Sequence, residues 1–208
     1  MLDWLDRWTR RLGGLAGLAV SLALYSGLVM GARHAKGRST EDAPEVARAF
    51  ARGSATAVVP STVLGLGALY LMWRPIRVGL SAPVRLAALV AGSILYFPGL
   101  AIMLWGRLTL GRMHNVSTSR AVQLFADHEL VTSGPFAHVR HPMYVGGIMA
   151  ELGALLLYRT WTTLLLAMDI PNLVMRSRRE EEALAAEFGE AWADYAGRVP
   201  GWLPRLGT

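Results

Sequence analysis

Long apolar runs with few or no charged residues are the feature that most constrains the fold of this chain. They cover residues 12–32, 55–73, 83–105 and 143–158. A helix of about 20 residues, rising roughly 1.5 Å per residue, crosses a hydrocarbon core about 30 Å thick. Charged residues make up 17% of the sequence, below the ~25% that is usual in soluble domains. The pattern predicts an all-α integral membrane protein.

A fifth, shorter span is predicted at residues 161–175, which carry Asp169, and we expect this acid to face the bundle interior or a cavity. The apolar run near the start is longer than a typical signal-peptide core, which favours a retained anchor. For the polar segment 33–54, a connecting loop and an interfacial helix remain equally open. After the apolar runs, residues 176–208 predict a charged and mostly helical tail, which stops at Gly197 and Pro200.

Basic residues predict which ends of the five spans share a membrane face. The segments 33–54, 106–142 and 176–208 hold 14 of the 21 Lys and Arg residues. The positive-inside rule places these three segments in the cytoplasm. Because residues 143–175 would then form one helical hairpin, its two ends meet at the same face.

Composition also limits the chemistry. The chain has no cysteine, which excludes disulfides and thiolate catalysis. The net charge is +6, but the sequence has no basic run with interleaved aromatics of the kind that marks nucleic-acid binding. The basic excess therefore favours a role in membrane topology and in contact with anionic lipids. Four of the five histidines, at positions 34, 114, 128 and 138, are spread without regular spacing, so no metal site is predicted.

The stretch HVRHPMYVGG at residues 138–147 begins the fourth span with an unusual set of side chains. Pro142 is tolerated in the first turn of a helix, which leaves Arg140 and His141 at its mouth. His141 and Tyr144 share one helix face. Gly146 and its neighbour allow close approach of another helix or of a flat ligand. The stretch could therefore be an interfacial anchor or one wall of a binding site.

Three adjacent glutamates follow the fifth span at positions 180–182. Such a run is usually a solvated helix face, supported by i,i+4 pairs such as Arg176–Glu180. However, three adjacent acids repel one another, and the hairpin brings them to the HVRHPMYVGG stretch. A cationic or polyhydroxyl ligand would suit them.

The sequence resembles the isoprenylcysteine carboxyl methyltransferase family in four elements: LVTSGPFAHVRHPMYVGG, the E-E-x-x-L at 180–184, the FGEAW at 188–192 and the V-P at 199–200. The bacterial phospholipid methyltransferases belong to the same wider group. The resemblance implies a bacterial plasma-membrane enzyme that transfers a methyl group from S-adenosylmethionine, releases S-adenosylhomocysteine and uses no metal. The site would face the cytoplasm beneath the tail. The acceptor would be hydrophobic or amphipathic and offer a carboxylate, an amine or a hydroxyl.

The resemblance divides the chain into an N-terminal membrane region, residues 1–105, and a catalytic region, residues 106–208. Within the catalytic region it implies a cofactor loop at 106–142, the hairpin at 143–175 and the tail at 176–208. By position, the cofactor-binding residues would be Leu130, Val131, His141, Pro142, Tyr144, Gly146, Glu180 and Glu181. Arg140 and Arg198 match arginines near the reacting centre, so they are the expected catalytic residues.

This chain departs from the family at some positions. Phe136 and Trp192 stand where tyrosines are common, and the tryptophan-rich continuation of the eukaryotic enzymes is missing. Two other functions remain as alternatives: an NADPH-dependent enzyme of the sterol-reductase type and a non-catalytic membrane scaffold. The acids at 180–182 would repel the extra phosphate of NADPH, which favours the methyltransferase.

Overall fold

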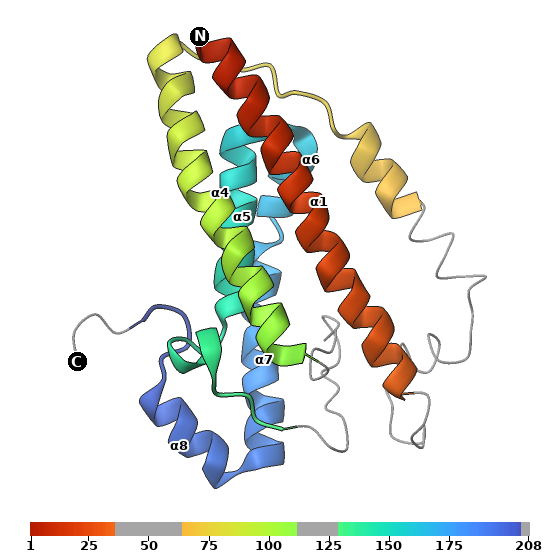
Figure 1. Ribbon diagram of the computed structural model, residues 1–208, viewed down its shortest axis with the longest axis vertical. Coiled ribbons are helices and arrows are strands. Elements are labelled where there is room, and N and C mark those ends of the chain that lie inside the picture. The colour runs from red at the N-terminus through yellow and green to blue at the C-terminus, as the bar shows by residue number, and fades with distance from the viewer. Residues whose placement is uncertain (36–63, 112–128, 205–208) are drawn as a thin grey trace.

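The computed structural model describes residues 1–35, 64–111 and 129–204, and these residues fold into helices. Residues 64–71 are also helical, and an isolated bridge between Pro75 and Thr160 is the only β-type pairing among the described residues. Figure 1 shows α1, α4 and α5 along the long axis, with α8 at the end far from the N-terminus. The labelled elements are α1 (Leu2–Ala35), α4 (Ala82–Leu110), the 3-10 turn η3 (Gly134–Ala137), α5 (Pro142–Tyr158), α6 (Trp161–Ala167), α7 (Ile170–Phe188) and α8 (Glu190–Arg198).

Helices α4 and α5 form the centre of the fold, and glycines let their backbones touch. A Cβ atom on Gly99 would lie 2.7 Å from the carbonyl oxygen of Gly146, and one on Gly146 would lie 2.6 Å from that of Gly99. Two turns further along α5, a Cβ on Gly153 would lie 2.5 Å from the amide nitrogen of Tyr96. Small residues on facing helices permit this approach in an apolar bundle. The contact fixes α5 rigidly against α4.

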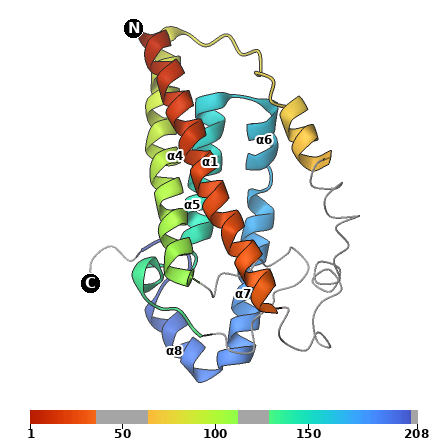
Figure 2. The same ribbon diagram turned by 45° about the vertical axis from the view of Figure 1, so that its right-hand side comes forward.

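Helix α1 crosses this pair diagonally (Figures 1 and 2) and is attached to it by two tyrosines. Tyr96 of α4 donates its hydroxyl to the carbonyl of Gly13 at 3.0 Å, and Tyr158 of α5 donates to the carbonyl of Arg10 at 2.8 Å. Around them lies the buried apolar cluster, which consists of Val20, Leu89, Tyr96, Leu100, Ala150 and Leu157. The end of the bundle near the N-terminus is therefore a three-helix contact.

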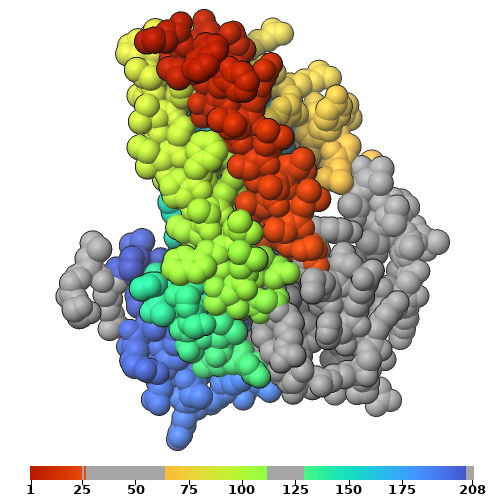
Figure 3. Space-filling model, in the orientation of Figure 1, coloured from red at the N-terminus to blue at the C-terminus, as the bar shows by residue number. Residues whose placement is uncertain are grey.

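Much of the apolar surface points outward. Leu15, Leu18 and Leu22 of α1 are exposed, as are Val90 and Ile94 of α4. Figure 3 shows α1 and α4 side by side on one face of the molecule. Among the described helices, α4 combines the length and hydropathy needed to cross a membrane, while α5 is apolar but shorter. Exposed aliphatic faces of this extent are unusual for a surface in water. The all-helical prediction is confirmed, whereas the number of five spans remains a prediction.

The predicted fifth span is wrong as a single helix. Helix α6 ends at Ala167 and α7 begins at Ile170, because Pro171 occupies the first turn of a new helix and cannot extend the previous one. Helix α7 then runs without a break past residue 175 to Phe188. Asp169 is exposed, and its carboxylate accepts a hydrogen bond from Asn172 at 2.6 Å, so it does not face the interior as we had expected.

Other boundaries differ by a few residues. Helix α4 continues to Leu110. The helical tail ends at Arg198, between Gly197 and Pro200 as predicted, and it is divided into α7 and α8 at Gly189, whose φ of 49° suits glycine. Residues 36–54 of the predicted polar loop lie outside the described residues, as does the first half of the predicted span 55–73.

Candidate active site

The start of α5 and the middle of α7 meet through Arg140, His141 and Glu181. Arg140 donates from Nε and from Nη2 to Oε1 of Glu181, at 3.0 and 2.8 Å. The Nε2 atom of His141 lies 2.7 Å from the same oxygen. The side chains of Arg140 and His141 are 16% and 5% exposed, whereas that of Glu181 is 31% exposed. One carboxylate oxygen thus joins two residues that lie about 40 positions earlier in the chain.

The environment keeps Glu181 ionised. Burial acts to raise the pKa of Glu181, but the hydrogen bonds with His141 and Arg140 outweigh burial and lower the pKa below its ordinary value. A charged carboxylate is therefore held at the N-terminus of α5 at neutral pH.

A second contact lies beside the first. The hydroxyl of Tyr144 donates to Oε1 of Glu180 at 2.5 Å. Since Glu180 and Glu181 are neighbours on α7, they reach α5 at points one turn apart. The structure thus brings together His141, Tyr144 and both glutamates, as we had predicted from sequence. Glu182, the third acid of the run, is exposed.

Arg140 also holds the tail. Its Nη1 group donates to the carbonyls of Ala196 and Val199, at 2.9 and 2.7 Å, near the negative end of the α8 dipole. The amide of Arg140 donates to the carbonyl of Pro200 at 2.8 Å, and its guanidinium lies 5.8 Å from the ring centre of Trp192. Arg140 is therefore the point at which α5, α7 and the tail converge.

Aromatic rings cover the cluster from the tail side. The amide of His141 donates to the carbonyl of Gly201 at 3.0 Å, which places Trp202 over the start of α5. The ring centres of Trp202 and His141 are 5.6 Å apart, and those of Trp202 and Tyr144 are 6.4 Å apart. An aromatic surface of this kind can hold a cation.

The tail is fastened a second time through α8. Tyr195 is buried, and its hydroxyl donates to the carbonyl of Phe136 at 2.7 Å. Burial raises the pKa of Tyr195 to about 12, against the opposing charge of Arg140, so the hydroxyl remains a donor at neutral pH. Trp192 is buried beside it, which agrees with a packing face along the tail helix.

Four predicted residues lie elsewhere in the fold or act differently. Gly146 faces α4 in the helix contact described above, and its expected role in cofactor binding stays a prediction. Arg198 is exposed, and its Nε donates to the carbonyl of Asp194 in its own helix, which does not fit a place at a reacting centre. Leu130 and Val131 are half-buried in an irregular segment rather than a strand. Pro142 is fully buried and begins α5, as expected.

Trp202 was missed, and Gly147 was singled out only as part of the glycine pair, without a cofactor role. Trp202 follows the V-P element of the tail, so its place after a recognisable motif could have indicated it. Gly147 is buried, yet a Cβ atom added there would have no neighbour within 4 Å. Gly146 and Gly147 therefore differ, because the first is packed against α4 and the second borders open space.

Part of this chain is similar in sequence to known proteins. Residues 93–186 match the model of the Isoprenylcysteine carboxyl methyltransferase (ICMT) family. This region is ICMT-like. It contains the contacts of Arg140, His141 and Tyr144 with both glutamates, whereas the tail residues that cover them lie beyond the match.

Individual relatives are similar to part of this chain. Protein-S-isoprenylcysteine O-methyltransferase of Schizosaccharomyces pombe is 38% identical over 82 residues, which are 38% of this chain and 35% of that protein. The enzyme of the same name from Homo sapiens is 39% identical over 80 residues, or 37% of this chain and 28% of that protein. The cobalt-zinc-cadmium resistance protein CzcN of Cupriavidus metallidurans is 36% identical over 85 residues, which are 38% of each chain. The chain thus spans well under half the length of these relatives.

Proposed function

We propose that this chain is an integral membrane methyltransferase that uses S-adenosylmethionine. The observation that carries the proposal is the meeting of Arg140, His141 and Tyr144 with Glu180 and Glu181 inside the ICMT-like region. The sequence resemblance implies a cofactor role for His141, Tyr144 and the two glutamates, and a place near the reacting centre for Arg140. The curated relatives named as O-methyltransferases support the same activity.

The side chains at this place suit the methyl donor. When bound, S-adenosylmethionine supplies a methyl group on a positively charged sulfonium. Glu180 can accept hydrogen bonds from the donor's ammonium group or ribose diol, in place of the Tyr144 hydroxyl. The rings of Tyr144 and Trp202 can face a cation. Gly147 leaves room beside them.

Within this proposal Arg140 and Glu181 position the site. Arginine has five N–H donors, and the described contacts of Arg140 engage four of them, two with Glu181 and two with tail carbonyls. At most one donor is left for an acceptor, so we assign Arg140 to holding Glu181 and the tail in place. A carboxylate acceptor needs no general base, whereas an amine must arrive deprotonated.

The acceptor we propose is a hydrophobic or amphipathic molecule that carries a carboxylate and enters from the bilayer. The isoprenylcysteine named for the relatives combines a carboxylate with a lipid, and the exposed aliphatic faces of α1 and α4 support a bilayer location. Amine and hydroxyl acceptors are the alternatives. We place the site at the cytoplasmic face, from the distribution of Lys and Arg along the sequence, in the bacterial plasma membrane that the sequence resemblance implies.

A methyl-transfer assay tests the function. Purified full-length protein would be incubated with methyl-labelled donor and a bacterial membrane lipid extract. We expect label in the lipid fraction, lost in Glu180→Gln and retained in Glu182→Gln, which removes the same charge from the neighbouring exposed position. If the lipid extract remains unlabelled, or if the two variants behave alike, the proposal is wrong.

A further inference from the structure

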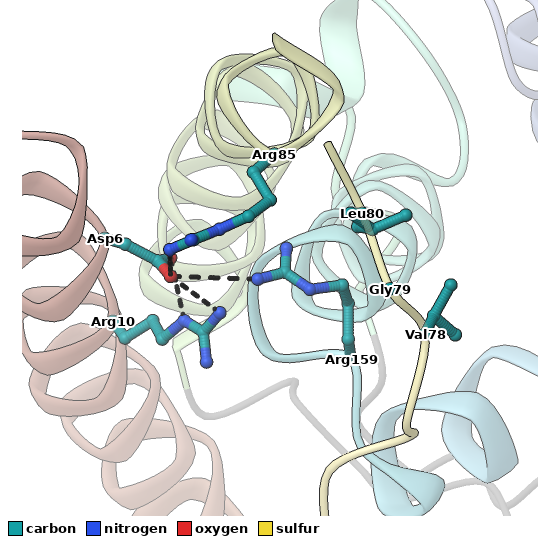
Figure 4. A pocket seen from close by; sticks show the side chains of 7 residues that line it. All are labelled: Asp6, Arg10, Val78, Gly79, Leu80, Arg85 and Arg159. Carbon is teal, nitrogen blue, oxygen red and sulfur yellow. Dashed lines mark hydrogen bonds and ion pairs between the residues drawn. The ribbon is translucent and has the colours of Figure 1, made fainter. Parts of the chain in front are cut away.

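A second polar site lies at the opposite end of α5. A cavity of about 360 Å³ opens there between α1, the start of α4 and the turn after α5. Its lining residues are Asp6, Arg10, Val78, Gly79, Leu80, Arg85 and Arg159. Figure 4 shows the guanidinium groups of Arg10, Arg85 and Arg159 directed toward the carboxylate of Asp6. Since α5 has 17 residues, this cavity is roughly 25 Å from the candidate active site.

Positive charge is in excess in this cavity. Asp6 accepts from Nε and Nη2 of Arg10 at 2.9 and 3.0 Å, while Arg85 and Arg159 are more distant from it, at 3.5 and 3.8 Å. Asp3 adds one contact with Arg85 from outside the lining, at 2.6 Å. Three arginines therefore share two carboxylates, and those at the greater distances gain less from Asp6. An anion between them would complete the charge balance.

Arg159 is held in the cavity by an unusual backbone. It follows the last residue of α5 with φ 52° and ψ 50°, and it is the one non-glycine residue with positive φ among the described residues. Glycine is the common residue at this position of a helix end, because other residues are strained there. Burial lowers the pKa of Arg159, and the nearby charge of Arg10 lowers it further. The sequence thus keeps a strained cation where glycine would fit better.

Hydrogen bonds hold the wall of the cavity in a fixed conformation. The amide of Ile76 donates to the carbonyl of Arg159 at 2.8 Å, and the amide of Trp161 donates to that of Arg74 at 3.2 Å. The hydroxyl of Thr162 donates to the carbonyl of Leu69 at 2.6 Å. These bonds attach the segment before α4 to the turn after α5, so the cavity keeps its shape.

Exposed tryptophans surround this end of the molecule. Trp4 and Trp8 lie on the first turns of α1, Trp73 lies against Tyr158, and Trp161 begins α6. Tryptophan is enriched where a membrane protein meets the headgroup region. Arg10 follows Trp8 by two residues and Arg159 precedes Trp161 by two, so these arginines are close in sequence to exposed tryptophans. This supports a place for the cavity in the headgroup region.

We propose that this arginine cavity binds the phosphate of an anionic phospholipid, in the leaflet opposite to the candidate active site. The guanidinium groups of Arg85 and Arg159 hold the phosphate oxygens, and Asp6 keeps Arg10 and its neighbours in position. Arginine suits this task because its planar group can donate two parallel hydrogen bonds to a phosphate. This site does not depend on the proposed methyltransferase activity.

Lipid retention by the purified full-length protein tests the proposal. The protein would be transferred into nanodiscs of phosphatidylcholine and phosphatidylglycerol, and the lipids retained after release would be counted by native mass spectrometry. We expect a preference for phosphatidylglycerol that falls about tenfold in Arg159→Gly, as for a lost charged hydrogen bond. The same variant should unfold at the parent's temperature or higher, because glycine relieves the backbone strain.

Control variants distinguish lipid binding in the cavity from a general attraction of anionic lipid to surface arginines. Arg77→Gly removes the same charge from an exposed position on the same face, outside the cavity lining, and should keep the preference. Arg85→Gln provides a second loss variant that leaves the turn after α5 unchanged. The proposal is overturned if Arg159→Gly and Arg85→Gln retain phosphatidylglycerol like the parent, or if Arg77→Gly loses it equally. Displacement of the lipid by excess inorganic phosphate would also overturn it, because the ligand would then be free phosphate.

Discussion

The two ends of α5 carry opposite chemistry. At its start, the carboxylates of Glu180 and Glu181 meet one arginine, one histidine and one tyrosine, and the tail covers the group. At its end, three arginines surround Asp6 in an open cavity. The glycine contact with α4 holds both ends of the helix in register. A single rigid helix thus separates a covered site rich in acids from an open site rich in arginine.

The two ends differ in how many of the arginine N–H donors have a carboxylate or carbonyl partner within the protein. Arg140 has carboxylate and carbonyl partners for most of its donors, which makes the covered end a clamp between helices. At the open end Arg85 has a close partner in the exposed Asp3, at 2.6 Å, and Nη1 of Arg159 donates to the carbonyl of Leu156 at 2.7 Å. Both arginines reach the shared carboxylate of Asp6 only at 3.5 and 3.8 Å. The first arrangement favours positioning, and the second favours capture of an anion.

Substitution of Gly146 by valine should have the largest effect, because it disturbs the helix that connects both ends. A side chain there meets the backbone of α4 at 2.6 Å, where no rotamer change can relieve the contact. We expect a loss of about 3 kcal/mol or more in unfolding free energy, measured by thermal unfolding in detergent. Gly147→Val is the matched control, since a Cβ atom at that position has no neighbour within 4 Å. Equal stability of the two variants would contradict the close α4–α5 contact.

Glu181→Gln should damage the covered end alone. Arg140 and His141 lose a charged partner, but Glu181 is about one-third exposed, so the loss is smaller than for a fully buried pair. We expect about 1–3 kcal/mol of stability, with a comparable weakening of donor binding. Lipid retention at the arginine cavity should stay at the parent's level. If Glu182→Gln, at the adjacent exposed position, has the same effect, the Glu181 contacts are not responsible.

The pH dependence of stability should report the same carboxylate. Because the pKa of Glu181 is lowered in the folded protein, its contribution is present above the unfolded value, near about 4.3, and is lost as the pH falls through the folded value. Unfolding followed between neutral and acid pH should therefore show a steeper loss in the parent than in Glu181→Gln. Parallel curves would show that Glu181 is not stabilised in its charged form.

Tyr195→Phe should give the smallest effect. It removes the hydrogen bond to the carbonyl of Phe136 and leaves the ring packing against Trp192 intact. We expect a loss of about 1 kcal/mol, and proteolysis of the tail should become faster before the bundle itself unfolds. A change as large as that of Glu181→Gln would mean that the tail is held by Tyr195 rather than by Arg140.

The covered site could be predicted from sequence more fully than the open one. The RHPxY and EE elements are local patterns, and a hairpin suffices to bring Arg140, Tyr144 and Glu181 together. The arginine cavity joins Asp6, Arg85 and Arg159, which are far apart in sequence and share no motif. Only the packing of α1 on α4 and α5 defines it. Pro171 is a sequence signal for a helix break, but the apolar character of residues 161–175 favoured a single span over two helices.

Calorimetric titration of the purified full-length protein with S-adenosylmethionine measures the donor binding on which the proposed activity depends. We expect the donor and its demethylated product both to bind. Glu180→Gln should weaken binding by about tenfold or more, and Glu182→Gln should bind like the parent. NADPH should give no binding. Binding of NADPH without the methyl donor, or donor binding that is unchanged in Glu180→Gln, would contradict the proposed function.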